Sequence, residues 1–108
     1  MANQEARLDA LGDPTRRSIL TRLRRQPMSV ARIAQGYRIS RPAISQHLRV
    51  LKDAGLVIDR AEGTKRIYEL NPAAFASLRE YFDELWGVAL QAFADRVKHE
   101  SKHQDGAP

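Results

Sequence analysis

Apolar residues recur at helical spacing through most of the chain, and glycine and proline residues separate the repeats. The pattern predicts a first helix over about residues 2–11 that stops at Gly12. A second helix is expected after Asp13-Pro14 and a third after Ser29, because both positions carry a side chain that can accept a hydrogen bond from a helix N-terminus. Gly36 is expected to stop the third helix.

The fourth predicted helix has the clearest one-sided pattern. Ser40 is placed to cap it, and Ile44, Leu48 and Leu51 follow at i, i+4 and i+7, which defines one buried stripe. Gly55 comes where the helix should end, followed by an apolar residue that can fold back on it. This helix therefore has one face for the core and one face left for another partner.

Helices three and four are joined by a short turn, an arrangement typical of a helix-turn-helix. In that motif the first helix supports the second, whose free face enters the DNA major groove. The free face carries Arg41, Pro42, Ser45, Gln46 and Arg49. No acidic residue occurs from Ser40 to Lys52, and Arg and Gln can pair with guanine and adenine edges. The helix is thus predicted to bind DNA, although an amphipathic helix with a solvated cationic face would show the same pattern.

After Gly55 the composition becomes strand-like. Residues 57–62 and 65–70 are rich in β-branched and aromatic side chains and are joined through Gly63, which predicts a β-hairpin. Basic residues gather near its tip, namely Arg60, Lys65 and Arg66. A hairpin in this place is the wing of a winged helix, and its tip can lie along the DNA backbone or reach the minor groove. Its apolar residues can complete the core at the same time.

A last helix is predicted from Asn71-Pro72 to about His99, roughly 40 Å long at the helical rise. Residues 100–108 lack an apolar anchor and are expected to form a disordered tail. Residues 1–99 are accordingly assigned to one winged helix-turn-helix domain that includes the terminal helix. The expected fold class is mainly α, with five helices and a small β-hairpin wing.

The charge of the chain is unevenly distributed. Residues 1–70 carry 14 basic and seven acidic side chains, whereas residues 71–108 carry four basic and six acidic ones. A basic front part favours a polyanionic partner for that part alone.

Three blocks of the sequence resemble the ArsR/SmtB family of bacterial repressors. The blocks are residues 11–20 (LGDPTRRSIL), residues 40–51 (SRPAISQHLRVL), and residues 54–57 with the following Glu62-Gly63 and Tyr68-x-Leu70. The match covers about residues 6–98. The resemblance implies a homodimeric, DNA-binding repressor of a pseudo-palindromic operator, with the first and last helices at the dimer interface. His47 is interpreted as positioned by the helix-turn-helix, with a phosphate contact of its own.

The last helix supports a dimer independently, because a helix of this length is long for one small core to cover. The predicted interface residues are Leu8, Leu11, Phe75, Leu78, Phe82, Leu85, Trp86 and Phe93. The alternative for these aromatic side chains is a pocket near Trp86 for a small apolar effector.

The motifs by which this family senses metals are missing from the sequence. There is no cysteine, and residues 30–33 (VARI) stand where the arsenic and cadmium sensors carry Cys-x-Cys. Residues 81–86 contain no His where zinc sensors carry Asp-x-His. Asp95, His99 and His103 lie at i, i+4 and i+8 near the end of the helix, where solvated His residues are common. We therefore expect no metal site and no cofactor.

Other function classes find little support in the sequence. There is no phosphate-binding loop, dinucleotide turn or Ser-His-Asp set, so the protein is not expected to be an enzyme. Residues 1–5 lack the pattern of an export signal and no apolar run could span a membrane, so a cytoplasmic location is expected. The alternatives left open are a nucleoid-like protein with low sequence specificity and a winged helix used for protein–protein interaction.

Overall fold

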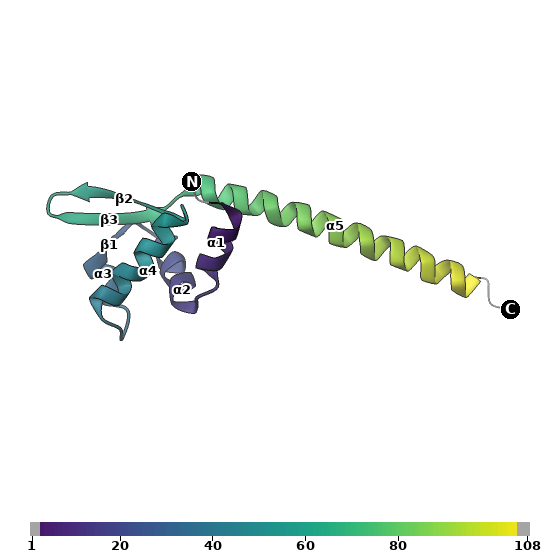
Figure 1. Cartoon of the computed structure of the whole chain (residues 1–108), viewed down its shortest axis with the longest axis horizontal. Coiled ribbons are helices and arrows are strands. Elements are labelled where there is room, and N and C mark those ends of the chain that lie inside the picture. Colours follow the sequence, from purple (N-terminus) through teal and green to yellow (C-terminus); the bar gives the residue numbers. More distant parts are fainter. Residues whose placement is uncertain (1–2, 106–108) are drawn as a thin grey trace. The chain divides into compact units, whose positions relative to one another are not determined.

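The computed structural model describes residues 3–105 (Figure 1). Side chains are described up to residue 100. Its elements are α1 (Gln4–Leu11), α2 (Pro14–Leu23), β1 (Met28–Ser29), α3 (Val30–Ala34), α4 (Arg41–Asp53), β2 (Val57–Glu62), β3 (Lys65–Leu70) and α5 (Pro72–Asp105). The five predicted helices and the hairpin between the fourth and fifth are confirmed.

The polar residues before the first four helices cap them as their sequence positions predict. Asn3, Asp13, Ser29 and Ser40 each accept a hydrogen bond from the backbone N–H three residues further on, over 2.8–3.3 Å. These bonds satisfy donors that a helix N-terminus leaves without an intrahelical partner. The cap at Asn3 explains why α1 begins at Gln4.

The hairpin belongs to a three-stranded antiparallel sheet with the order β1-β3-β2. Strand β1 was not predicted, because two residues carry no periodicity of their own. It pairs Met28 with Tyr68 and Ser29 with Ile67. Between β2 and β3 the loop has two residues, and Gly63 takes a φ of 63° there, a conformation that strains other L-residues.

The core of the winged-helix part is built from the apolar stripes of α2, α3 and α4. Its most deeply buried side chains are Ile19, Ile33, Ile44, Leu48, Leu51, Leu56 and Val57. The predicted glycine stop of α4 is confirmed, since Gly55 has a φ of 78° and Leu56 N–H donates back to the Leu51 carbonyl over 2.9 Å. Leu56 is thereby folded back into the core that α4 covers.

The chain divides into two compact units, the first ending at Phe75 and the second beginning at Ala76. The second unit consists of the remainder of α5, which continues as a helix to Asp105, beyond the predicted end near His99. No glycine or proline occurs between Gly87 and Gly106, so nothing in the local sequence stops it sooner. Residues 106–108 of the predicted tail lie outside the described residues. None of the described helices is long and apolar enough to cross a membrane.

Candidate nucleic-acid interface

The free face of α4 is open to solvent. The five residues predicted on it are all exposed, namely Arg41, Pro42, Ser45, Gln46 and Arg49. Lys52, which the sequence analysis did not assign, is exposed as well and follows Ser45 and Arg49 at i, i+4 and i+7. The same spacing rule that identified the buried stripe could have found it.

A first hollow joins the beginning of α4 to the hairpin tip. It has a volume of about 230 Å³ and is lined by Ser29, Val30, Ala31, Arg41, Thr64, Lys65 and Arg66. Arg41 thus meets Lys65 and Arg66, which are distant from it in the sequence, around one concave surface. Two hydroxyl groups, on Ser29 and Thr64, add hydrogen-bonding capacity at the same place. Such a lining suits a phosphate group.

A second hollow lies between the middle of α4 and strand β3. It has a volume of about 350 Å³ and is lined by Ser45, Arg49, Lys52, Asp53 and Tyr68. Helix α4 and the β2–β3 hairpin therefore share two concave surfaces. The predicted residues Ser45 and Arg49 line the second of them. Tyr68 was predicted only as a core residue of the hairpin, because nothing in a strand sequence shows which neighbour will lie opposite.

The register of the hairpin separates its basic residues. Arg66 pairs with Ala61, two residues from Asp59 on the same face, whereas Arg60 pairs with Ile67 and lies on the opposite face. The Arg60 guanidinium approaches Glu69 at 3.1 Å and Glu62 at 3.6 Å. Lys65 and Arg66 line the first hollow, whereas Arg60 lines neither, and its contact with DNA stays a prediction.

One carboxylate connects the wing to the recognition helix. Asp59 Oδ1 lies 3.0 Å from Lys52 Nζ, and its Oδ2 lies 3.1 Å from Arg66 Nε. The Asp59 side chain is only 9% exposed, although its two partners are about half exposed. The sequence analysis missed Asp59, since its role depends on a contact between two elements.

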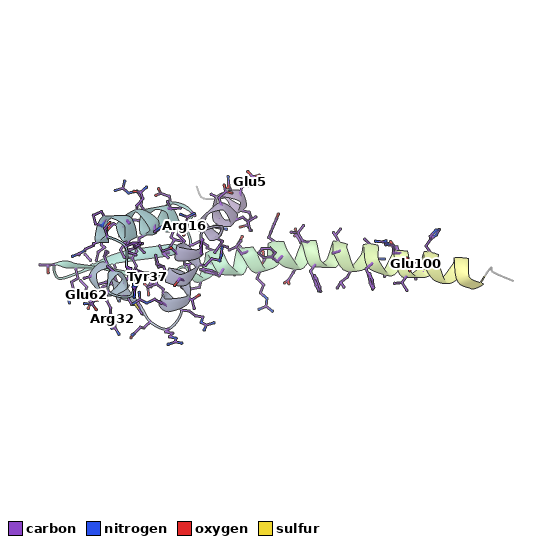
Figure 2. All side chains as sticks on the ribbon, turned by 90° about the horizontal axis from the view of Figure 1, so that it is seen from below. Glu5, Arg16, Arg32, Tyr37, Glu62 and Glu100 are labelled. Atoms are coloured by element: carbon purple, nitrogen blue, oxygen red, sulfur yellow. The ribbon has the colours of Figure 1, made fainter. Side chains whose placement is uncertain are left out.

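His47 faces the protein more than the solvent. It is half-buried, and its Nδ1 lies 3.4 Å from Arg16 Nη1 at the start of α2. Arg16 in turn donates from Nε to the Ala10 carbonyl over 2.7 Å, and Figure 2 shows it among the helices. His47 is therefore positioned by its neighbours, as expected, and a phosphate contact would have to come from its other ring nitrogen.

Several arginines of the basic front part serve the fold. Arg7, Arg17 and Arg22 donate to the carbonyls of Ala54, Leu11 and Ile33, each at or near the C-terminal end of a helix. These guanidinium groups satisfy acceptors that helix ends leave open. The arginines on α4 and at the wing tip make no such bond to a helix end, so their charge is available to a polyanion.

The turn between α3 and α4 is held by a small side-chain network. The Arg22 guanidinium lies 5.3 Å from the ring centre of Tyr37, and the Tyr37 hydroxyl is 2.8 Å from Ser18 Oγ. Tyr37 and Arg32 are labelled near this turn in Figure 2. Acidic side chains are absent from the sequence between Pro14 and Lys52, which spans α2, the turn and the recognition helix. Up to Lys52 the motif thus presents no charge that would repel phosphate, and the first acidic residue after it is Asp53 at the end of α4.

Comparison with known proteins gives consistent matches. The family model described as a helix-turn-helix domain matches residues 11–60. The HTH-type transcriptional regulator Rv2034 of Mycobacterium tuberculosis is 47% identical over 91 residues, 84% of this chain and 85% of that protein. The transcriptional repressor SdpR of Bacillus subtilis is 44% identical over 62 residues, 57% of this chain and 69% of that protein. The crystal structure of an ArsR family transcriptional regulator matches with a TM-score of 0.73 and 27% identity, covering 78% of this chain and 92% of that one.

The chain belongs to the ArsR/SmtB family of transcriptional regulators. The resemblance of the three sequence blocks is thereby confirmed, and so is the winged-helix fold that it implied. Within this ArsR/SmtB fold, α4 is the recognition helix and the β2–β3 hairpin is the wing.

Metal-binding residues of the ArsR/SmtB sensors have no counterpart in the described part of this chain. Where side chains are described, no three His, Asp or Glu residues gather as metal ligands would. Asp95 Oδ1 accepts a hydrogen bond from Gln91 Nε2 over 3.1 Å. Whether Asp95, His99 and His103 lie close together is not tested, because the side chain of His103 lies outside the described residues.

Proposed function

We propose that this protein is a homodimeric repressor that binds a pseudo-palindromic DNA operator. The observation that carries the proposal is the pair of cation-lined hollows between the recognition helix and the wing. They place cationic groups suited to phosphate at the start and in the second half of a helix whose outer face offers Gln46 and Ser45 to bases. Binding DNA, rather than catalysis, is the proposed activity, which places the protein with the chromosome in the cytoplasm.

The proposed roles differ between α4 and the wing. Gln46 and Ser45 project from the exposed face of α4, where an amide or hydroxyl can reach base edges in the major groove. Arg41, Lys65 and Arg66 surround the first hollow and are proposed to hold a backbone phosphate, which sets the register of the helix. Pro42 and Arg49 lie on the same exposed face and complete the contact surface.

Dimerisation is proposed to use the apolar face of α5. Trp86 is 65% exposed and Phe93 is 66% exposed, and Phe82 and Leu85 on the same helix face are about half exposed. An apolar stripe of this size is unfavourable in water, so a second copy of the chain is its proposed occupant. A dimer of this kind presents two recognition helices to two half-sites. Of the other predicted interface residues, Leu8, Leu11 and Phe75 are half-buried, whereas Leu78 is already buried within the chain.

The hollow beside Trp86 supports an interface better than an effector pocket. Its volume is about 390 Å³, and its lining of Phe82, Asp83, Leu85, Trp86 and Ala89 comes entirely from one helix. A site for a small apolar ligand needs walls on several sides. In the proposed dimer the partner would supply them, so an effector, if one regulates the protein, would bind after dimerisation.

The proposal is tested by separating base contacts from phosphate contacts. The operator is first selected from genomic fragments with the wild type. Gln46→Ala is then expected to weaken operator binding by about 1–3 kcal/mol and to leave random duplex binding unchanged. Lys65→Ala and Arg66→Ala should weaken both and reduce the salt slope by roughly one unit each. Arg60→Ala is the matched control, and its effect should be smaller because Arg60 lines neither hollow and pairs with two carboxylates, Glu62 and Glu69.

Three results would contradict the proposal or favour its alternatives. Equal loss on operator and random DNA for Gln46→Ala would mean that α4 reads no bases. A wild type that binds all duplexes equally would favour the nucleoid-like alternative. A wild type that binds no DNA at low salt would leave the winged helix as a protein-interaction module.

A further inference from the structure

Asp59 is the carboxylate that the hairpin contributes beside the cations of the two hollows. It lies on the hairpin face that carries Arg66, and its side chain is 9% exposed. An anion close to a DNA-binding surface weakens binding through Coulomb repulsion, and burial adds the cost of removing it from water. Its presence therefore needs a compensating role.

The two oxygens of Asp59 bind two different elements. Oδ1 is 3.0 Å from Lys52 Nζ in the last turn of α4, and Oδ2 is 3.1 Å from Arg66 Nε in β3. The partners also line different hollows, Lys52 the second and Arg66 the first. One carboxylate thus restrains a cation in each of the two concave surfaces that recognition helix and wing share.

The other acidic residues of the hairpin make no such connection. Glu62 and Glu69 both pair with Arg60, which lies on the opposite face of the same hairpin. Of the ion pairs formed within residues 3–100, the one between Asp59 and Lys52 links the wing to α4. Glu62 carries the same charge in the same hairpin and is therefore a natural control for Asp59.

We propose that Asp59 is a positioning residue that couples the wing to the recognition helix. Asp59 pairs with both Lys52 and Arg66 and so keeps these two side chains at a fixed distance from each other. Contacts of the wing with the DNA backbone and contacts of α4 with the bases therefore form together. Without it, the two long side chains repel each other and regain rotamer freedom, which must be lost again on binding. Asp59 consequently raises affinity for the operator without raising affinity for random DNA. This inference rests on the proposed function.

The decisive experiment compares Asp59→Asn with Glu62→Gln, because each removes one negative charge from the hairpin. Affinities for operator and random duplex are measured at several salt concentrations. Glu62→Gln should raise both affinities by a similar factor. Asp59→Asn should lower operator affinity about fivefold to tenfold, as expected for breaking one side-chain network, while affinity for random DNA stays equal or rises. If Asp59→Asn raises both affinities as Glu62→Gln does, the positioning role is wrong.

A second variant keeps the proposal testable if Asp59→Asn does not fold. Lys52→Met breaks the helix side of the bridge and leaves the contact between Asp59 and Arg66. Lys65→Ala is the comparison, because loss of a phosphate contact alone lowers the affinities for operator and for random duplex equally. Lys52→Met should lower the ratio of operator to random affinity as well, and an unchanged ratio would overturn the proposal.

A measurement without DNA separates this inference from the proposed function. The chain has no native cysteine, so spin labels can be placed by Thr64→Cys at the wing tip and Gln35→Cys at the end of α3. Labelled protein is diluted with unlabelled protein to suppress distances between copies. Asp59→Asn should broaden the distance distribution, whereas Glu62→Gln should not, and equal distributions would refute the coupling. If the wild type binds no DNA, the proposed function fails while this readout still decides the coupling.

Discussion

At the scale of single residues, similar basic side chains serve different purposes. Arg16 uses its guanidinium to hold the Ala10 carbonyl and to approach His47, so its charge is part of the packing of α2. Arg41, the first residue of the recognition helix α4, is exposed and lines the first hollow. The difference arises because helix ends in a small domain leave carbonyls that a long, forked donor can reach.

The cap at Asp13 makes part of the stability pH-dependent. The hydrogen bond donated by Arg16 N–H lowers the pKa of the Asp13 carboxyl below its ordinary value of 3.8, and the Arg16 charge acts in the same direction. Because the folded pKa is the lower one, the ionised carboxylate stabilises the fold above about pH 4, and this contribution is lost as the pH falls through the folded value.

Asp13→Asn keeps an acceptor at the cap but removes its titration. The wild type is therefore expected to melt at a higher temperature than Asp13→Asn near neutral pH, and the difference should shrink as the pH is lowered from about 5 to about 2. Circular dichroism melts at several pH values measure it. Asp13→Ala, without an acceptor, should be the least stable near neutral pH. A difference between wild type and Asp13→Asn that does not change with pH would refute the role of the ionised carboxylate.

At the scale of elements, the turn of the helix-turn-helix depends on a close approach. A Cβ atom at Gly36 would lie 2.5 Å from Arg22 Nη1, so a larger residue fits there only if the Arg22 guanidinium moves away. The sequence analysis assigned Gly36 to helix termination, which is a local reason. The structure adds a tertiary one, since Arg22 donates to the Ile33 carbonyl over 2.6 Å and stacks on Tyr37.

Gly36→Ala should displace the Arg22 guanidinium and lower the free energy of unfolding by about 1.5–3 kcal/mol, the range for losing hydrogen bonds of a charged group. In the Arg22→Ala background the same substitution should cost much less, because the side chain it displaces is gone. Gly87→Ala in α5 is the matched control. No atom lies within 4 Å of its added Cβ, so Gly87→Ala should stabilise the chain by up to about 1 kcal/mol. Denaturant unfolding measures all four variants, and equal costs of Gly36→Ala in both backgrounds would contradict the mechanism.

At the scale of the whole molecule, α5 leaves large apolar side chains exposed in the single chain. It has 34 residues, about 50 Å of helix, and its large apolar side chains beyond Tyr81 are exposed. Figure 2 shows side chains projecting from this helix along its length. A second copy of the chain would cover the aromatic face, so DNA binding and assembly are expected to depend on each other.

Trp86→Glu should produce a monomer and abolish operator binding, because a charge in the centre of the proposed interface would be buried without a partner. Val88→Glu is the control. Val88 is 70% exposed, like Trp86, but lies roughly 200° further round the helix at 100° per residue. Sedimentation at tens of micromolar should show a dimer for wild type and Val88→Glu. A monomeric wild type, or a dimeric Trp86→Glu variant, would refute the proposed interface.

Zinc should not release the protein from its operator. A metal shifts a conformational equilibrium only by binding two states differently, and the described residues offer no cluster of ligands for it. Zinc is titrated into the complex of operator with wild type or with His99→Ala/His103→Ala. Release of the wild type alone at micromolar zinc would show that the terminal His residues form a sensor after all.

Local signals were sufficient for the elements and for the recognition helix. Helix caps, proline positions and apolar spacing act over a few residues, so they can be recognised in the sequence alone. The structure confirms the cap at Ser40 and the buried stripe of Ile44, Leu48 and Leu51. The exposed face of α4 follows directly from its buried face. The hairpin was predictable for the same reason, because composition and Gly63 determine it locally.

The relations between elements required the tertiary structure. Strand β1 forms only because β3 pairs with it. The strand register places Arg60 and Arg66 on opposite faces of the hairpin, and amino-acid composition does not determine that register. The bridge from Lys52 through Asp59 to Arg66 joins two elements, so no local pattern could have shown it. Hydrophobic periodicity predicts which side of a helix or strand faces the core. The packing of the elements against each other then decides which side chains come into contact.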